Sequence, residues 1–451
     1  MNRPLTFRQY LAPAAVACAL VLQAAGVHAA IAIQRWTQPD GAQVYLVESP
    51  AIPMVDVQID FDAGARRDPS SKAGLASSTA GMTSSGIAAR RGEPALDEDA
   101  LGEAWTDLGA SFGASAGGDR MSFSLRSLTE PDLLARATRL AARQMGEPAF
   151  PDAVWQRDRA RGIAALREAN TRPGTIAGRA FGQAVYGSHP YGFEATEETL
   201  GRIGVDDMKA FYSQRIRPCR AKLSIVGAVT RTQAQALATA LLARLPQGGC
   251  EAGADAVVPE VAPLTRANDQ RIPFESAQAH VYIGQPGYRR ADADHFALMV
   301  GNYTLGSGGF VSRLYSEVRE KRGLSYSVGS YFSPGLHAGA FTINLQTRPD
   351  QAQQALDLSR EVLVRFVAEG PTEAELQAAK DNLIGGFPLL LDSNRTLLGN
   401  VANIAWSNLP LDYLDTWTQK VQAVTTADVK AAFARKLQPD RMVSVIVGGK
   451  P

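Results

Sequence analysis

The sequence predicts an α+β fold made of two homologous halves, each a mixed or antiparallel sheet packed with helices. Two observations predict it. Segments about 220 residues apart match without a gap, and both halves combine alternating strand patterns with helical periodicity. The composition of the 451 residues, 45% hydrophobic and 20% charged, is typical of a globular chain with several domains. It excludes disordered, collagen-like and coiled-coil proteins.

The charges are nearly balanced, with 46 Lys and Arg against 45 Asp and Glu and a formal net charge of +1. A chain of this kind has no overall field that attracts nucleic acid or anionic lipid. We therefore expect neither nucleic-acid binding nor electrostatic membrane attachment.

The N-terminal 29 residues have the pattern of a secretory signal peptide. Arg3 and Arg8 precede an apolar run over residues 11–26, and small residues follow it. Because this run is short for a membrane span, we expect cleavage near Ala30 and a periplasmic or secreted protein without stable membrane insertion. An uncleaved anchor is the alternative. Cys18 lies inside the apolar run, so we do not expect it to carry a lipid.

Cys219 and Cys250 remain after cleavage. One pair of cysteines is no disulfide framework for a chain of this length, and a zinc site built from thiolates needs more ligands. We expect either a single optional disulfide or two buried thiols.

The clearest internal repeat pairs Ile203–Val229 with Val424–Pro451 at a constant offset of 221. Each copy predicts a short amphipathic helix, a break at proline and an apolar strand that ends at glycine. The chain therefore contains the same structural unit twice, once in each half. The matched pairs include Asp207 with Asp428, Pro218 with Pro439, Ile225 with Ile446 and Gly227 with Gly448.

Other segments fit the same two halves. Met54–Asp62 alternates apolar and polar residues and predicts a half-buried strand, and its C-terminal counterpart is His280–Ile283, before a turn at Pro286 and Gly287. Leu245–Gln270 is rich in Pro, Gly and Ala and predicts a linker. We therefore expect domains at residues 30–244 and 271–451. Helical periodicity covers Asp132–Met145, Ala153–Glu168, Gln351–Ala368 and Glu373–Asn382.

Common catalytic patterns are missing from the chain. The histidines of the mature chain are His189, His280, His295 and His337, and no two are spaced to share a helical face for zinc. His189 lies in a turn, where a structural hydrogen bond is the better interpretation. Serines occur without a nucleophile elbow. The run Gly306–Gly309 is a weak candidate for an anion site at a helix N-terminus, since the residues that complete phosphate or dinucleotide motifs are absent.

Phe310–Phe332 carries the most informative pattern. Leu314 and Val318 predict a helix face, Gly323 predicts its end, and Ser325–Phe332 predicts a strand. A helix that turns back at this glycine can place Arg319 beside Tyr326. A guanidinium and a phenol are fixed donors for a peptide carbonyl or an oxyanion. An ordinary helix-end cation and a strand tyrosine explain the pair equally well.

The segment from Gly306 to Val328, G-S-G-G-x-x-S-R-L-x-x-x-V-R-E-K-R-G-L-S-Y-S-V, resembles the C-terminal signature of the insulinase/pitrilysin-type zinc metallopeptidases. So do Gly370–Lys380 and Tyr186–Gly192. The resemblance covers essentially the whole mature chain and implies a duplicated α+β fold. It also implies that Arg319 and Tyr326 bind substrate next to the scissile bond.

The chain departs from this family at the zinc motif. Where the family has H-x-x-E-H, the sequence has Ser77 and Gly81 at the ligand positions and Ala80 at the general base. None of these residues binds zinc tightly or moves a proton at neutral pH. The family's downstream acidic ligand falls near Arg157 and Asp158. We therefore expect no metal in this chain.

The combination resembles the bacterial two-chain members of the family. In these, one subunit carries H-x-x-E-H and its partner carries the Arg/Tyr pair. The resemblance implies a non-catalytic subunit of a periplasmic heterodimeric zinc endopeptidase, with zinc in the partner and with peptides or small unfolded proteins as substrates. An inert peptide-binding clamp or chaperone, and a structural core subunit of the same fold, are the alternatives.

Overall fold

The computed structural model describes residues 31–90, 92–249 and 256–449. The segment predicted as a signal peptide and Cys250 lie outside these residues. Cys219 is disulfide-bonded. Within the described ranges, no helix is both long and apolar enough to cross a membrane.

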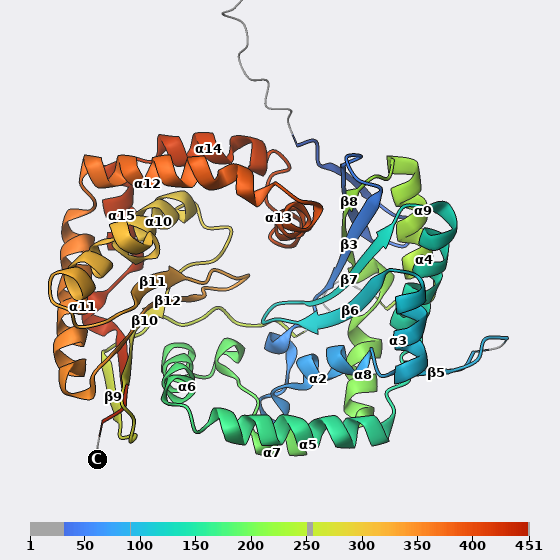
Figure 1. Cartoon of the computed structure of the whole chain (residues 1–451), viewed down its shortest axis with the longest axis horizontal. Coiled ribbons are helices and arrows are strands. Elements are labelled where there is room, and N and C mark those ends of the chain that lie inside the picture. The colour runs from blue at the N-terminus through green and yellow to red at the C-terminus, as the bar shows by residue number, and fades with distance from the viewer. Residues whose placement is uncertain (1–30, 91, 250–255, 450–451) are drawn as a thin grey trace, which may run out of the picture.

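Each half contains one mixed sheet (Figure 1), and the strands of the second sheet match β2, β8, β3, β7 and β6 of the first in order and direction, whereas β1 has no counterpart among the described residues. In each sheet only one pair of strands is parallel, β2 with β8 in the first and β9 with β13 in the second. The predicted fold of two homologous halves is confirmed. The first sheet has the order β1 (Gln34–Thr37), β2 (Gln43–Glu48), β8 (Lys222–Gly227), β3 (Met54–Phe61), β7 (Met121–Leu128) and β6 (Ser111–Ala116). The second has the order β11 (Val328–Phe332), β12 (Ala340–Thr347), β10 (Ala279–Pro286), β13 (Val443–Val447) and β9 (Asn268–Ile272).

The predicted helices all form, within a few residues of their expected ends. The first half contains α2 (Leu75–Met82), α3 (Glu98–Asp107), α4 (Pro131–Gly146), α5 (Asp152–Ala169), α6 (Pro173–Tyr186), α7 (Glu197–Gly201), α8 (Val205–Arg215) and α9 (Arg231–Leu242). The second contains α10 (His295–Asn302), α11 (Ala352–Glu369), α12 (Glu373–Gly386), α13 (Asn394–Trp406), α14 (Tyr413–Ala423) and α15 (Thr426–Lys436). A small ribbon, β4 (Gly86–Ile87) with β5 (Leu96–Asp97), precedes α3.

The repeat found in the sequence holds in structural detail. Helices α8 and α15 begin and end at positions 221 apart. Asp207 and Asp428 each accept a hydrogen bond of 2.9 Å from the N–H of the residue before their helix, Gly204 and Thr425. The same local signal therefore starts the same helix twice.

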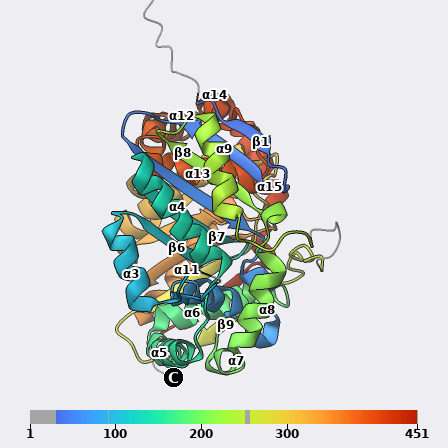
Figure 2. The same cartoon turned by 90° about the vertical axis from the view of Figure 1, so that its right-hand side faces the viewer.

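The two halves exchange one helix each. Helix α6 of the first half packs on the second sheet, where Phe181 lies among Val443 and Val445 of β13. Helix α13, which begins 221 residues after α6, packs on β3 and β8 of the first sheet. Figure 1 shows α13 on the face of that sheet that is turned away from α4 and α9. Figure 2, turned by 90°, shows α3, α4 and α9 on the outer side of the first half.

The exchange changes the environment of β3. The polar face of this strand was expected to meet solvent, but Asp56 is 5% exposed and Asp60 is fully buried. Asp60 accepts hydrogen bonds from Arg120 Nη1 at 2.9 Å and from the Ser122 hydroxyl at 2.5 Å. The expectation of a half-buried strand was wrong, because α13 of the other half covers this face.

Arg120 and Lys222 connect this polar layer to α13. Arg120 Nη1 lies 3.2 Å from the Ala402 carbonyl, and Lys222 Nζ donates to the Ala405 carbonyl and to Asn408 Oδ1, both at 2.8 Å. Burial lowers the pKa of Lys222 to about 8. Lys222 therefore places a positive charge at the C-terminal end of α13, where the helix dipole favours a cation.

The two halves also contact each other where a turn of the first sheet meets a turn of the second sheet. Asp119 accepts hydrogen bonds from the Tyr191 hydroxyl at 2.6 Å and from the N–H of Leu336 at 2.9 Å, which links the β6–β7 turn to the β11–β12 turn. His189 is 5% exposed and bonds the Pro259 carbonyl at 3.0 Å. The structural hydrogen bond expected for this histidine is confirmed.

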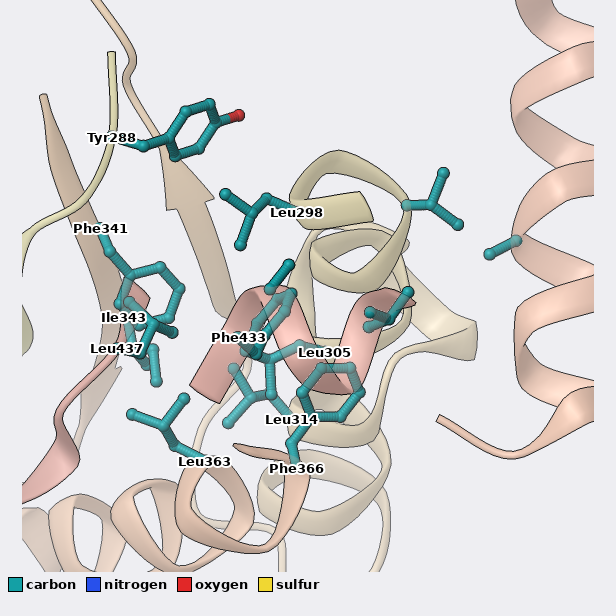
Figure 3. Packing of buried hydrophobic residues seen from close by; sticks show 14 of the residues in the cluster. Tyr288, Leu298, Leu305, Leu314, Phe341, Ile343, Leu363, Phe366, Phe433 and Leu437 are labelled. Atoms are coloured by element: carbon teal, nitrogen blue, oxygen red, sulfur yellow. The ribbon is translucent and has the colours of Figure 1, made fainter. Parts of the chain in front are cut away.

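The core of the second half positions the segment that contains Arg319. Figure 3 shows Phe433 of α15 among Leu305, Leu314 and Phe366. The Phe366 and Phe433 rings are 4.9 Å apart, and both side chains are fully buried. Leu314 therefore anchors the start of the Arg319 helix in a rigid, close-packed environment.

We expect the second half to lose stability in mild acid through His295. Burial and, secondarily, the Arg290 charge lower the pKa of His295 to about 3, and its Nδ1 lies 3.0 Å from the Tyr288 hydroxyl. Between pH 6.5 and 3 the unfolded chain binds this proton and the folded chain does not, so stability falls as the pH drops through 6.5. From pH 7 to 5 the loss is about 1–2 kcal/mol.

Urea unfolding at pH 7 and at pH 5 measures this loss. Between these two pH values, the His295→Gln variant should lose about 1–2 kcal/mol less stability than the unmodified chain. An unchanged pH dependence in the variant would contradict the assignment to His295.

Candidate functional site

Arg319 lies on η7 (Tyr315–Glu320), a turn of π-helix. Leu314 and Val318 are fully buried, as their spacing predicts. The helix ends at Glu320, and the turn after it closes at Gly323, which has φ +62° and donates to the Arg319 carbonyl at 2.9 Å. Its successor Leu324 donates to Val318 at 2.9 Å. This is the glycine-ended turn that the sequence predicts.

Tyr326 lies in the loop that follows this turn. A strand was predicted from Ser325 onward, but β11 begins at Val328. The Ser325 hydroxyl donates to the Ser327 carbonyl at 2.7 Å and accepts from the Ser327 N–H at 3.2 Å. This local serine turn replaces the strand hydrogen bonds, so the predicted strand start was wrong.

The turn brings Arg319 and Tyr326 into contact. The Arg319 guanidinium carbon lies 4.4 Å from the centre of the Tyr326 ring, 4.6 Å from that of Tyr315 and 5.7 Å from that of Phe310. Arg319 Nη1 also bonds the Tyr315 hydroxyl. Three aromatic rings therefore fix the direction of the guanidinium through cation–π contacts.

The outer part of this group faces solvent. Tyr326 is 82% exposed and Phe310 72%, whereas Tyr315 is buried. The other N–H groups of Arg319 have no hydrogen-bond acceptor within the described part of the chain. They are available to an oxygen atom of a bound molecule, such as a peptide carbonyl.

Sequence reasoning missed two members of this group. Tyr315 is one helical turn before Arg319, a spacing that places both on one face. Phe310 directly follows the glycine run, and a bulky exposed aromatic residue at that place was the available signal. Neither was singled out.

The glycine run Gly306–Gly309 has a packing role. A Cβ at Gly306 would lie 2.5 Å from the Ser330 backbone nitrogen, and one at Gly308 would lie 2.6 Å from the Tyr303 carbonyl. Asn302 donates to the Ser330 carbonyl at 3.0 Å in the same buried layer. The run allows its helix to approach β11 closely, which explains these glycines without a bound anion.

We expect Gly306→Ala to destabilise the chain by about 2–3 kcal/mol, because the new methyl group meets backbone atoms in a close-packed layer. Urea unfolding measures the change. Gly399→Ala is the control, since a Cβ on that exposed residue of α13 meets nothing within 4 Å. The control should keep or slightly raise stability. Equal stabilities of the two variants would contradict the packing role.

Ser77, Ala80 and Gly81 lie together on α2. Ser77 and Gly81 are exposed one helical turn apart, and Ala80 is 1% exposed. A Cβ at Gly81 would meet nothing within 4 Å. The helix therefore presents a hydroxyl and an open space at these two positions, neither of which provides an imidazole or a carboxylate.

Comparison with known proteins identifies the family of this chain. A family model described as the peptidase M16 inactive domain matches residues 202–383. The crystal structure of a peptidase M16 inactive domain from Pseudomonas fluorescens is 34% identical to this chain, covers 93% of it and 98% of its own length, and has a TM-score of 0.86. The chain belongs to the peptidase M16 family. The predicted family resemblance is confirmed.

Relatives of this M16 chain include proteins named as proteases and one named as a non-peptidase. An uncharacterised zinc protease of Streptomyces coelicolor is 28% identical, over 61% of this chain and 60% of its own length. The non-peptidase homolog YmxG of Helicobacter pylori is 24% identical, over 67% of this chain and 69% of its own.

The residues at the M16 zinc positions do not fit zinc. A serine and a glycine replace both imidazole ligands, and Asp158, near the third position, is paired with Arg157 at 2.8 Å and lies 3.7 Å from Arg161. In the described ranges, no group of three or more His, Cys, Asp or Glu side chains could hold a metal ion. We therefore derive no chemical step from a metal in this chain.

Proposed function

We propose that this M16 chain is the non-catalytic, substrate-positioning subunit of a heterodimeric periplasmic zinc endopeptidase. The observation that carries the proposal is a division between the halves. The first half has Ser77, Ala80 and Gly81 in place of the zinc motif, whereas the second half keeps an Arg319 guanidinium that is fixed by aromatic rings and open to a ligand.

Arg319 would act on the carbonyl of the scissile peptide. Its side chain is held by the Tyr315 hydroxyl and by stacked rings, so its free N–H groups need little reorganisation when an oxyanion develops. Such donors lower the barrier whichever chain supplies them. The Tyr326 hydroxyl, at the exposed rim, would add a second donor.

A partner subunit would supply the remaining chemistry. Zinc, its bound water and the glutamate base would come from a chain with H-x-x-E-H. The composite site forms only when the two chains face each other, and together they would enclose a chamber for peptides or small unfolded proteins.

An extended substrate would pair with the edge strand β6. This strand ends the first sheet, and its residues are mostly small, with open space beside Gly113. The corresponding edge strand β11 is less available, since Asn302 already bonds the Ser330 carbonyl. Main-chain pairing accepts many sequences, which suits a peptidase of broad specificity.

The exposure of Tyr326 and Phe310 favours a role in contact with peptide over a purely structural role, which has no use for an open guanidinium. An inert peptide clamp would use the same residues without hydrolysis. A peptidase assay separates the two. The purified mature chain should be inactive alone, and it should raise peptide hydrolysis at least about 100-fold when mixed with an H-x-x-E-H partner. No gain with such a partner would favour the clamp.

A further inference from the structure

A cavity of about 680 Å³ opens between the N-terminal end of α10 and the helices α14 and α15. Two aromatic rings, Phe296 and Tyr413, form one wall with their centres 5.8 Å apart. The cavity is large enough for one or two amino-acid residues. It is lined entirely by the second half and contains neither Arg319 nor Tyr326.

Two cations beside these rings lack an acidic partner. Arg290 lies 5.1 Å from the Tyr413 ring centre, and its Nη2 donates to the Tyr413 hydroxyl at 2.7 Å. Lys420 Nζ lies 5.7 Å from the centres of both rings. Across the described ranges of the chain, neither forms an ion pair with a carboxylate.

The carboxylates of the cavity are already engaged. Asp292 pairs with Lys436 at 2.5 Å, and Asp294 pairs with Arg435 at 2.6 Å. Asp428 accepts hydrogen bonds at the start of α15. The positive end of α10 also lies here. Two cations, Arg290 and Lys420, are therefore left without an ion pair against the one carboxylate of Asp428, and the balance next to the rings is positive.

The first half shows that the fold does not require this cavity. At the offset of 221, Thr199 stands where Lys420 stands in the second half, and its hydroxyl donates to the Ala73 carbonyl at 2.9 Å. Lys72, just before α2, crosses to Asp207 at 2.5 Å. In the first half, polar contacts bridge the equivalent space. In the second half, Lys420 makes no such contact within the described ranges of the chain.

We infer that this cavity binds the carboxylate end of a peptide whose last residue is large and apolar. The carboxylate would lie between Arg290 and Lys420, and the apolar side chain would pack on Phe296 and Tyr413. A guanidinium and an ammonium group are the usual recognition groups for a carboxylate. This inference does not rest on the composite peptidase site, because no residue is shared between the two.

Calorimetric titration of the mature chain with N-acetyl-L-phenylalanine at low salt tests the site. We expect saturable binding with a Kd of about 1 mM, which is ordinary for so small a ligand. N-acetyl-L-phenylalaninamide, without the charge, and N-acetylglycine, without the ring, should each bind at least about tenfold more weakly. Equal binding of acid and amide, or no saturable binding, would overturn the inference.

Lys420→Met supplies the matched variant, since it removes the charge and keeps the apolar stem. It should weaken acid binding about tenfold and leave amide binding unchanged. Lys209→Met, on an exposed position of α8 in the first half, should change neither. The same loss in both variants would show a nonspecific charge effect and overturn the site. If Lys420→Met folds poorly, the comparison of the acid, the amide and N-acetylglycine on the unmodified chain still tests the site.

Discussion

We expect Arg319→Ala to lower peptide turnover by the assembled complex about 100-fold or more, while the two subunits still associate. The guanidinium is the best-fixed cation of the site, held by one hydroxyl and three rings, and its loss removes a donor that acts at the transition state. Arg319→Lys should recover little, since an ammonium group cannot reproduce the planar fork or its stacking. Tyr326→Phe keeps the stacked ring and should lose about tenfold.

Arg322→Ala is the control for these variants. Arg322 lies just beyond the same helix, but it pairs with Glu317 at 2.6 Å and has no aromatic contact with the site. Turnover should stay within about twofold of the unmodified complex. Unchanged turnover in both Arg319→Ala and Tyr326→Phe would show that the Arg/Tyr pair has no part in catalysis.

Asp60→Ala should have the largest effect on stability, a loss of about 3 kcal/mol in the free energy of unfolding. Asp60 is fully buried beneath the exchanged helix α13, and its carboxylate compensates Arg120, with Lys222 also nearby. Without the Asp60 carboxylate, the positive charges of Arg120 and Lys222 lie under α13 with no negative charge to compensate them. Urea unfolding measures the loss, and the same experiment should show earlier separation of α13 from the first sheet.

The control for Asp60→Ala is Asp107→Ala, at an exposed position on α3, with an expected change within about 0.5 kcal/mol. The double variant Asp60→Ala with Arg120→Met should recover part of the loss, because it removes an uncompensated cation as well. A cost below about 1 kcal/mol for Asp60→Ala would mean that the polar layer does not hold the halves together.

The sequence was sufficient to predict the repeated unit because the signals of that unit are local. The proline that breaks the chain and the strand that ends at glycine occur in both copies, and they form the same elements in both. The same holds for Gly323, whose left-handed conformation closes the turn after the Arg319 helix and brings Tyr326 onto the guanidinium. Such features depend on a few neighbouring residues, so they can be read without tertiary information.

The exchange of α6 and α13 could not be predicted in this way. The polar residues of β3 look like a solvent face, and nothing near them in the sequence indicates a helix that begins more than 330 residues later. Phe310 was missed for a different reason, since its ring reaches Arg319 across the π-helical turn between them, a geometry that ordinary helical spacing does not predict. Contacts of long sequence separation carry no local pattern.

Affinity purification of the mature protein from its native cell at moderate salt, with mass spectrometry of any stoichiometric companion, tests the central claim most directly. We predict a companion of similar size that carries H-x-x-E-H, present at one to one and accounting for the zinc in the preparation. A chain that purifies alone and without zinc would contradict the composite peptidase and leave Arg319 and Tyr326 as a peptide-binding device.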